Sequence, residues 1–146
     1  MTQDFWKIAE LGLNPYGNAR RTQNGDDWSF TCQHGAKECE GNLIEACVLR
    51  LYGDHFYADS LPFVVCLESN SYNFTTQGKK CATQFGLDWD KINSCATSKQ
   101  GRQYLADLGE ATDKLSPAHQ YVPWFTVNGE HSSAAESALS TDMVKS

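Results

Sequence analysis

Residues 32–47 read Cys32-Gln33-His34-Gly35-Ala36-Lys37-Glu38-Cys39-Glu40-Gly41-Asn42-Leu43-Ile44-Glu45-Ala46-Cys47, and the rest of the chain is organised around them. The stretch holds three of the six cysteines, one histidine and two glycines. Cys39, Leu43 and Cys47 recur every four residues and share one face of a helix. This spacing predicts a helix from about Glu38 to Leu51.

The predicted helix limits which cysteines can form disulfides. Eight residues of helix rise by ~12 Å, whereas a disulfide needs its Cα atoms within roughly 7 Å of each other. Cys39 and Cys47 therefore cannot pair with each other. Cys32 is the nearest partner for Cys39 through a tight loop, and the candidates for Cys47 are Cys66, Cys81 and Cys95.

The composition excludes several classes of protein. A chain of 146 residues suits one domain over residues 1–146, and 40% hydrophobic residues supply one core. The net charge of −6 argues against a surface for nucleic acid or for an anionic membrane. The longest apolar run, residues 61–67, is too short to span a bilayer.

Signals for the cellular compartment conflict. The first twelve residues contain no apolar secretory segment, so the chain as given has no signal peptide. Six cysteines in a small domain nevertheless indicate an oxidising compartment. Asn73-Phe74-Thr75 is a glycosylation sequon, which is used only in the secretory pathway, and Asn73 is the candidate acceptor. Either a leader has been removed upstream, or this is a shortened product.

Local patterns predict the elements of the first half of the chain. In order, we expect the end of a helix over residues 5–11, a strand over 11–13, an exposed loop over 20–27, a strand over 28–31 and a polar loop over 70–80. The apolar run Pro62–Glu68 fits either a buried strand or a short helix.

The second half contains clearer signals. We expect short helical pieces over residues 81–85 and 88–95, and a longer helix after Gly101 that Ser116-Pro117 ends. Residues 121–127 are aromatic, β-branched and apolar, which predicts a central strand. Asn128-Gly129 predicts a two-residue hairpin turn, with residues 130–132 returning antiparallel. Ser133 and Glu136 predict a capping box for a last helix.

The pattern C-Q-H-G-x2-E-C-x2-N-x4-C resembles the signature of the gamma-interferon-inducible lysosomal thiol reductase (GILT) family. Its fixed positions are Cys32, Gln33, His34, Gly35, Glu38, Cys39, Asn42 and Cys47. Residues 15–19 (P-Y-G-N-A) and 95–101 (C-A-T-S-K-Q-G) resemble two further family segments. The resemblance extends over residues 5–128.

This resemblance implies an α/β fold, a thioredoxin-like sheet with a cysteine-rich helical insertion, and favours helix for Pro62–Glu68. Such a reductase uses two cysteines as C-x-x-C at a helix N-terminus, where the helix dipole stabilises the thiolate. In the family this pair lies upstream of the P-Y-G-N-A string, and no two cysteines here stand three apart. We therefore expect the first strand and first helix to be missing and no catalytic residue to be present. The unpaired sheet edges would leave the chain marginally stable or self-associating.

One element of a thioredoxin-like active site is implied near the C-terminus. Residues 121–124 (Y-V-P-W) resemble the loop that holds the cis-proline of such folds. The backbone before that proline pairs with an extended substrate, which would make Val122 and Pro123 the substrate shelf. The alternative is an ordinary X-Pro bond at the start of a strand.

His34 allows two chemical roles besides a structural one. With Cys32, Cys39 and Cys47 it could bind zinc, but the helical gap between the last two fits one tetrahedron poorly. As a general base it lacks a nearby nucleophile. A structural hydrogen-bonding role is preferred, and neither a metal nor a cofactor is expected.

Three functions follow for this chain. The first is a thiol–disulfide oxidoreductase of the GILT family, acting on disulfide-containing proteins or peptides, lysosomal or secreted by resemblance, whose activity is absent here because the C-x-x-C is missing. The second is a non-catalytic secreted module that keeps the peptide-binding shelf. The third, least favoured, is a zinc-stabilised adaptor.

Overall fold

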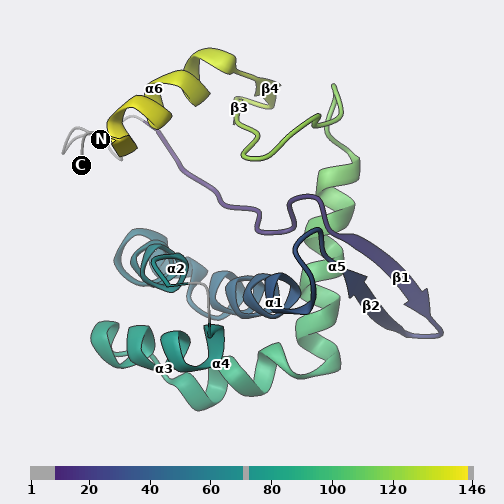
Figure 1. Ribbon diagram of the computed structural model, residues 1–146, viewed down its shortest axis with the longest axis vertical. Helices are drawn as coiled ribbons and strands as arrows, with labels where there is room; N and C mark the ends of the chain where they lie inside the picture. Colours follow the sequence, from purple (N-terminus) through teal and green to yellow (C-terminus); the bar gives the residue numbers. More distant parts are fainter. Residues whose placement is uncertain (1–8, 71–72, 145–146) are drawn as a thin grey trace.

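The computed structural model describes residues 9–70 and 73–144 (Figure 1). Its elements in chain order are β1 (Arg20–Asn24), β2 (Asp27–Thr31), α1 (Ala36–Leu51), the 3₁₀ turn η2 (Gly53–His55), the π-helical turn η3 (Phe56–Ser60), α2 (Leu61–Glu68), α3 (Phe74–Phe85), α4 (Trp89–Ala96), α5 (Lys99–Asp113), β3 (Thr126–Val127), β4 (Glu130–His131) and α6 (Ser133–Val144). Helix α1 contacts α2, α3, α4 and α5 and is the centre of the molecule. The β3–β4 pair and α6 lie together at one end of it (Figure 1).

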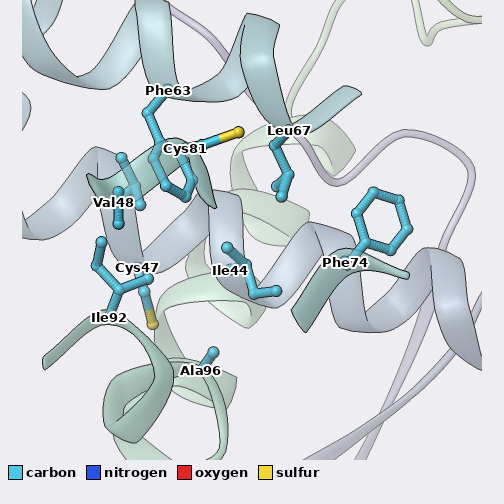
Figure 2. Packing of buried hydrophobic residues seen from close by; sticks show 10 residues of the cluster. Ile44, Cys47, Val48, Phe63, Leu67, Phe74, Cys81, Ile92 and Ala96 are labelled. Atoms are coloured by element: carbon cyan, nitrogen blue, oxygen red, sulfur yellow. The ribbon is translucent and has the colours of Figure 1, made fainter. Parts of the chain in front are cut away.

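The main core lies between α1 and the helices α2 to α4 (Figure 2). Its largest side chains are at most 1% exposed: Ile44, Val48, Phe63, Leu67 and Ile92. Burying one such side chain contributes about 1.5–3 kcal/mol. The predicted helix over Glu38–Leu51 is confirmed, and Pro62–Glu68 is helical rather than extended.

Side-chain caps explain where three helices begin. Asn73 Oδ1 accepts a hydrogen bond from Thr76 N–H at 3.0 Å, which starts α3. Asp88 Oδ1 accepts from Lys91 N–H at 3.1 Å and starts α4. Ser98 Oγ accepts from Gly101 N–H at 3.1 Å and starts α5. Each cap satisfies a backbone donor that the first helical turn leaves free. The polar loop expected over residues 70–80 is therefore wrong from residue 74 onward, because Asn73 begins a helix there.

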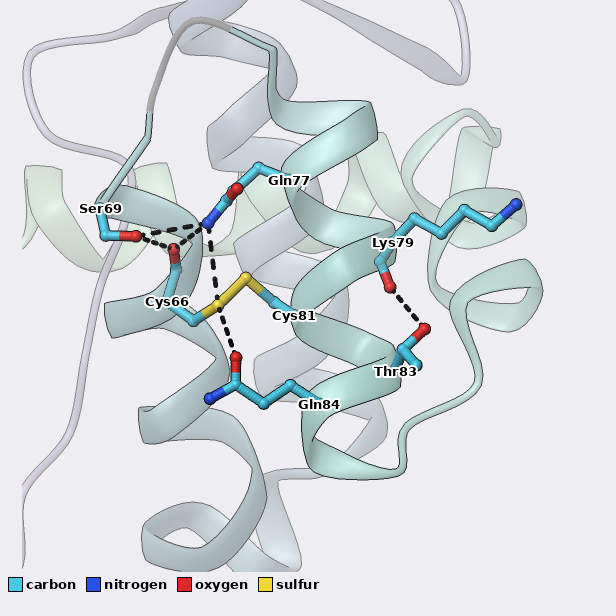
Figure 3. Close-up of a disulfide and its surroundings, with 7 residues drawn as sticks. All are labelled: Cys66, Ser69, Gln77, Lys79, Cys81, Thr83 and Gln84. Atoms are coloured by element: carbon cyan, nitrogen blue, oxygen red, sulfur yellow. Dashed lines mark hydrogen bonds between the residues drawn. A yellow bond between two sulfur atoms is a disulfide. The ribbon is translucent and has the colours of Figure 1, made fainter.

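Three disulfides use all six cysteines; two join helix to helix, and the third joins α1 to the loop before it. Cys32 pairs with Cys39, Cys47 with Cys95, and Cys66 with Cys81. Figure 3 shows the last of these, where Gln77 Nε2 donates to the backbone oxygen of Cys66 at 2.8 Å. Because all six cysteines are in disulfides, none is a free thiolate of the kind that binds zinc, and the described residues contain no cluster suited to a metal ion.

An ion pair between Arg102 and Asp27 holds the β1–β2 hairpin against α5. Arg102 donates from Nε and Nη2 to the two carboxylate oxygens of Asp27, both at 2.8 Å. This bidentate pair holds the pKa of Asp27 at about 2. Trp28 Nε1 donates to Gln103 at 3.1 Å, also on α5. The exposed loop expected over residues 20–27 is instead strand β1 and its turn, because Gly25, at φ +64°, permits a two-residue hairpin.

The sheet differs from the expectation. The described residues form two separate antiparallel pairs, β1–β2 and β3–β4, within a helix-rich α/β arrangement. The continuous thioredoxin-like sheet expected from the resemblance is not evident in this part of the chain. Residues 11–13 form no strand. Of the helix end expected over residues 5–11, residues 9–11 are not helical, and residues 5–8 lie outside the described residues.

The predicted central strand over residues 121–127 is also wrong. Only Thr126 and Val127 pair, with His131 and Glu130, and both are exposed. A central strand needs partners on both sides, and β4 is the sole partner among the described strands. The predicted turn at Asn128-Gly129 is confirmed, with positive φ at both residues.

No helix within the described ranges is both long and apolar enough to cross a membrane.

Candidate functional site

The Val122–Pro123 peptide bond is cis, as the resemblance of residues 121–124 implied. It lies in an irregular segment between α5 and β3, where Tyr121 is 45% exposed and Val122 is 47% exposed. The backbone on the N-terminal side of Pro123 therefore belongs to an open, partly apolar surface.

Three segments that are distant in sequence meet at this surface. A Cβ built on Gly17 would lie 4.0 Å from Val122 Cγ1, so the turn over residues 15–19 touches the cis-proline loop. Asn18 Nδ2 donates to Gln33 Oε1 at 3.2 Å, which joins that turn to the loop over residues 32–35. The same Asn18 contacts His119 Nε2 through Oδ1 at 3.0 Å.

The turn over residues 15–19 is fixed to α5. Tyr16 is 4% exposed, and its N–H donates to Asn14 Oδ1 at 3.1 Å. Asn14 Nδ2 in turn donates to the carbonyl of Leu108 at 3.0 Å and to Thr112 Oγ1 at 3.2 Å. These bonds hold the backbone of Asn18 in place against the helical body.

The loop over residues 32–35 is closed by the Cys32–Cys39 disulfide and by backbone bonding. Gly35 N–H donates to the carbonyl of Cys32 at 3.1 Å, and Gly35 has φ +91°. Glu38 Oε2 accepts from His34 N–H at 2.7 Å and lies 2.9 Å from His34 Nδ1. The His34 side chain is 81% exposed, and its partner Glu38 lies one helical turn further along the chain.

Glu136 of α6 also holds the cis-proline loop. Tyr121 Oη donates to Glu136 Oε2 at 2.7 Å, and His131 Nε2 lies 2.8 Å from Glu136 Oε1. The hydrogen bond from Tyr121 lowers the pKa of Glu136, and the same bond raises the pKa of Tyr121. Trp124 stacks on His131 with ring centroids 3.6 Å apart.

Comparison with known proteins identifies the family. Residues 1–85 match the family described as gamma interferon inducible lysosomal thiol reductase (GILT). The chain belongs to the GILT family.

Relatives from animals and from a plant match most of the chain. The gamma-interferon-inducible lysosomal thiol reductase of Carassius auratus is 36% identical over 126 residues, 85% of this chain and 48% of that protein. The protein of the same name from Mus musculus is 36% identical over 84% of this chain and 48% of its own length. The gamma-interferon-responsive lysosomal thiol protein of Arabidopsis thaliana is 35% identical over 87% and 50%. The chain thus spans about half the length of these relatives.

The residues of the GILT signature have separate places in the structure. Cys32, Glu38 and Cys39 close the loop, and Asn42 Nδ2 lies 3.9 Å from Cys32 Sγ. Gln33 points to Asn18, whereas Cys47 is fully buried and paired with Cys95 on α4. The signature therefore builds one loop and one helix-to-helix bond rather than a single cluster.

Asn73, the predicted glycosylation residue, is exposed at the start of α3. Thr75 of the same sequon donates through Oγ1 to Glu40 of α1 at 2.5 Å. This region is separate from the cis-proline surface in sequence and in its hydrogen bonds.

Sequence reasoning missed His119, His131 and Glu136 as members of the site. Glu136 was assigned to a capping box with Ser133, but Ser132 Oγ accepts from Ala135 N–H at 3.2 Å and is the cap. This shift by one residue leaves the carboxylate of Glu136 to bind Tyr121. The run of His131, Ser132 and Ser133 offered no local signal for this choice.

Proposed function

We propose that this chain supplies the substrate-binding surface of a GILT-type thiol–disulfide oxidoreductase, and that these residues alone reduce no disulfide. The observation that carries the proposal is the open surface at Tyr121 and Val122, just before Pro123, which the turn over residues 15–19 adjoins. Membership of a thiol reductase family supports disulfide-containing proteins or peptides as the substrate class.

The binding step rests on backbone chemistry. An extended peptide can add to an exposed backbone as a strand does, with main-chain hydrogen bonds giving affinity and neighbouring side chains giving selectivity. Val122 offers its backbone groups beside two exposed apolar side chains, its own and that of Tyr121. A peptide segment next to a disulfide would lie along this shelf.

The electron-transfer step needs a dithiol. A thiolate attacks the substrate disulfide to form a mixed disulfide, and a second thiol then releases the reduced substrate. No two of the six cysteines in the sequence have the C-x-x-C spacing, and all six are in disulfides. In this proposal these residues bind the substrate, and the reducing dithiol comes from outside them.

Insulin reduction tests the lack of activity. With dithiothreitol as the reductant, the purified chain should leave the rate of insulin reduction at the background rate of dithiothreitol alone. Thioredoxin under the same conditions is the positive control. Turnover clearly above background would show that a disulfide of this chain exchanges with substrate, and would refute this part of the proposal.

Nuclear magnetic resonance tests the binding surface. A short peptide with one internal disulfide, titrated into ¹⁵N-labelled chain, should shift the Val122 amide signal saturably. Val122→Asp should abolish the shifts around the shelf. Val65→Asp is the matched control, because Val65 is 63% exposed on α2 and lies outside the shelf. Equal loss in both variants, or no saturable shift in the native chain, would reject the shelf.

The non-catalytic secreted module is the second candidate, favoured by the missing C-x-x-C spacing. For the oxidoreductase we propose a lysosomal or secretory location, supported by the three disulfides and by the names of the relatives. Sequencing the transcript upstream of Met1 separates the two candidates. An in-frame C-x-x-C supports the oxidoreductase, and its absence supports the binding module.

A further inference from the structure

Asn18 stands between two loops that the sequence separates widely. Its Nδ2 donates to Gln33 Oε1 at 3.2 Å, across 15 positions, and its Oδ1 lies 3.0 Å from His119 Nε2, across 101 positions. Because Oδ1 can only accept, the hydrogen in the second contact is carried by His119 Nε2. One amide group thereby links the loop over residues 32–35 to the segment that leads into Pro123.

On the helical side, the chain neighbour of Asn18 and its partner Gln33 are both tied to buried residues. Ala19, the next residue, is 7% exposed and its N–H donates to the carbonyl of Tyr16 at 3.1 Å. Gln33 follows Cys32, which is 7% exposed and bonded to Cys39. The amide of Asn18 therefore has a fixed position and a fixed orientation.

The segment on the other side is not held in this way by regular structure. Residues 114–125 contain no helix or strand, and Pro117, Gln120, Tyr121 and Val122 are exposed. His119 is half-buried and lies three residues before Val122. Its bond to Asn18 fixes the irregular segment at a point close to the shelf.

We propose that Asn18 and His119 are positioning residues for the Val122–Pro123 shelf. Asn18 accepts the imidazole N–H and thereby sets the distance of the shelf from the loop over residues 32–35. Neither side chain reacts with substrate. The inference rests on the proposed function, since it concerns how well the shelf is presented to a peptide.

Two variants and a conservative replacement test the bond. His119→Ala should weaken binding of the disulfide peptide by about fivefold to tenfold, the effect of losing one hydrogen bond. Asn18→Ala should weaken binding at least as much, because it removes the bond to Gln33 as well. His119→Gln should bind like the native chain, because its amide N–H can also donate to Asn18 Oδ1. Asn24→Ala is the matched control, since it removes an asparagine bond to Ser29 in the β1–β2 hairpin.

Backbone relaxation gives a readout that needs no peptide. The heteronuclear NOE of the Val122 amide should fall in Asn18→Ala and in His119→Ala and should stay unchanged in His119→Gln and Asn24→Ala. If Asn18→Ala does not fold, His119→Ala decides alone, because His119 lies outside the helical body. An unchanged NOE at Val122 in His119→Ala overturns the positioning role.

Failure of the two proposals is distinguishable. If the native chain shows no saturable shift at Val122, the shelf as a substrate site is rejected, whereas the relaxation data still accept or reject the role of the bond. If the native chain binds and both alanine variants bind equally well, only the positioning role is rejected.

Discussion

Gly101 of α5 lies directly against the backbone carbonyl of Cys95. A Cβ at position 101 would be 2.1 Å from that oxygen and 3.1 Å from Cys47 Sγ. Ser98 lies between them and bonds to both, donating to the Cys95 carbonyl at 2.7 Å and accepting from Gly101 N–H. The backbone of Cys95 and the residues Ser98 and Gly101 therefore pack closely where α4 ends and α5 begins.

Gly101→Ala should lower the free energy of unfolding by about 3 kcal/mol, because backbone and a disulfide cannot yield to the added methyl group. Urea denaturation measures the change. Gly53→Ala is the control, since a Cβ there meets no atom within 4 Å and its stability should be nearly unchanged. Equal effects of the two substitutions would contradict the packing described here.

The disulfides should differ in their contribution to stability. Cys47–Cys95 closes 48 residues and Cys32–Cys39 closes 7. Replacing both cysteines of the first pair by alanine should cost about 4 kcal/mol, against about 2.5 kcal/mol for the second, because the longer loop leaves the unfolded chain more entropy to regain. Urea midpoints of the two double variants give the order, and the reverse order would contradict the prediction.

Glu45 should make the chain more stable in acid. Its carboxyl is 6% exposed, and its Oε1 has no hydrogen-bond partner among the described residues. Burial first, and then the hydrogen bond and charge of Glu68, raise the pKa of Glu45 well above its ordinary value. The folded state therefore keeps a proton that the unfolded state releases. This contribution is complete below the unfolded pKa, near 4.5, and is lost as pH rises through the raised folded pKa.

Glu45→Gln should remove this dependence and stabilise the chain at pH 7, as measured by urea midpoints from acid to neutral pH. Asp27 contributes to stability with the opposite pH dependence, which Asp27→Asn should remove. Arg102 lowers the pKa of Asp27 to about 2, so its contribution is present above the unfolded pKa of 3.8 and is lost as pH falls through about 2. A Glu45→Gln curve parallel to that of the native chain would refute the assignment.

Tyr121→Phe should raise the pKa of Glu136 towards its ordinary value, because the main hydrogen bond to the carboxylate is lost. Carbon-13 titration of the Glu136 carboxyl measures the shift. Tyr57→Phe serves as control, since Tyr57 bonds to Leu11 and Ala9 instead. An unchanged titration in Tyr121→Phe would show that this bond does not form in solution.

The spacing of apolar residues and cysteines along the sequence predicted the features that lie within a single helix. The repeat of Cys39, Leu43 and Cys47 placed α1 and excluded a bond between its own cysteines, and Cys32 pairs with Cys39 as its nearness suggested. The spacing predicted only residues 81–85 of α3. Residues 74–80 were missed because their exposed face is polar and their buried face includes Gly78, which packs against the ring of Trp89. A glycine adds no apolar signal to a helical repeat.

The candidate site could not be predicted in the same way, because it is built by contacts between segments that are distant in the sequence. The aromatic and β-branched run over residues 121–127 has the composition of a buried strand, but Trp124 stacks on His131 instead of entering a sheet. Nothing near His119 in the sequence points to Asn18. The family resemblance marked residues 15–19 and 121–124 separately, and the structure shows how they meet.

Asn73 caps the start of α3 with only one of the two polar atoms of its side-chain amide. The bond to Thr76 N–H uses Oδ1, whereas an N-linked sugar would be joined to Nδ2. Carbohydrate attachment would therefore leave the first turn of the helix intact. The same side chain can cap the helix and carry an oligosaccharide.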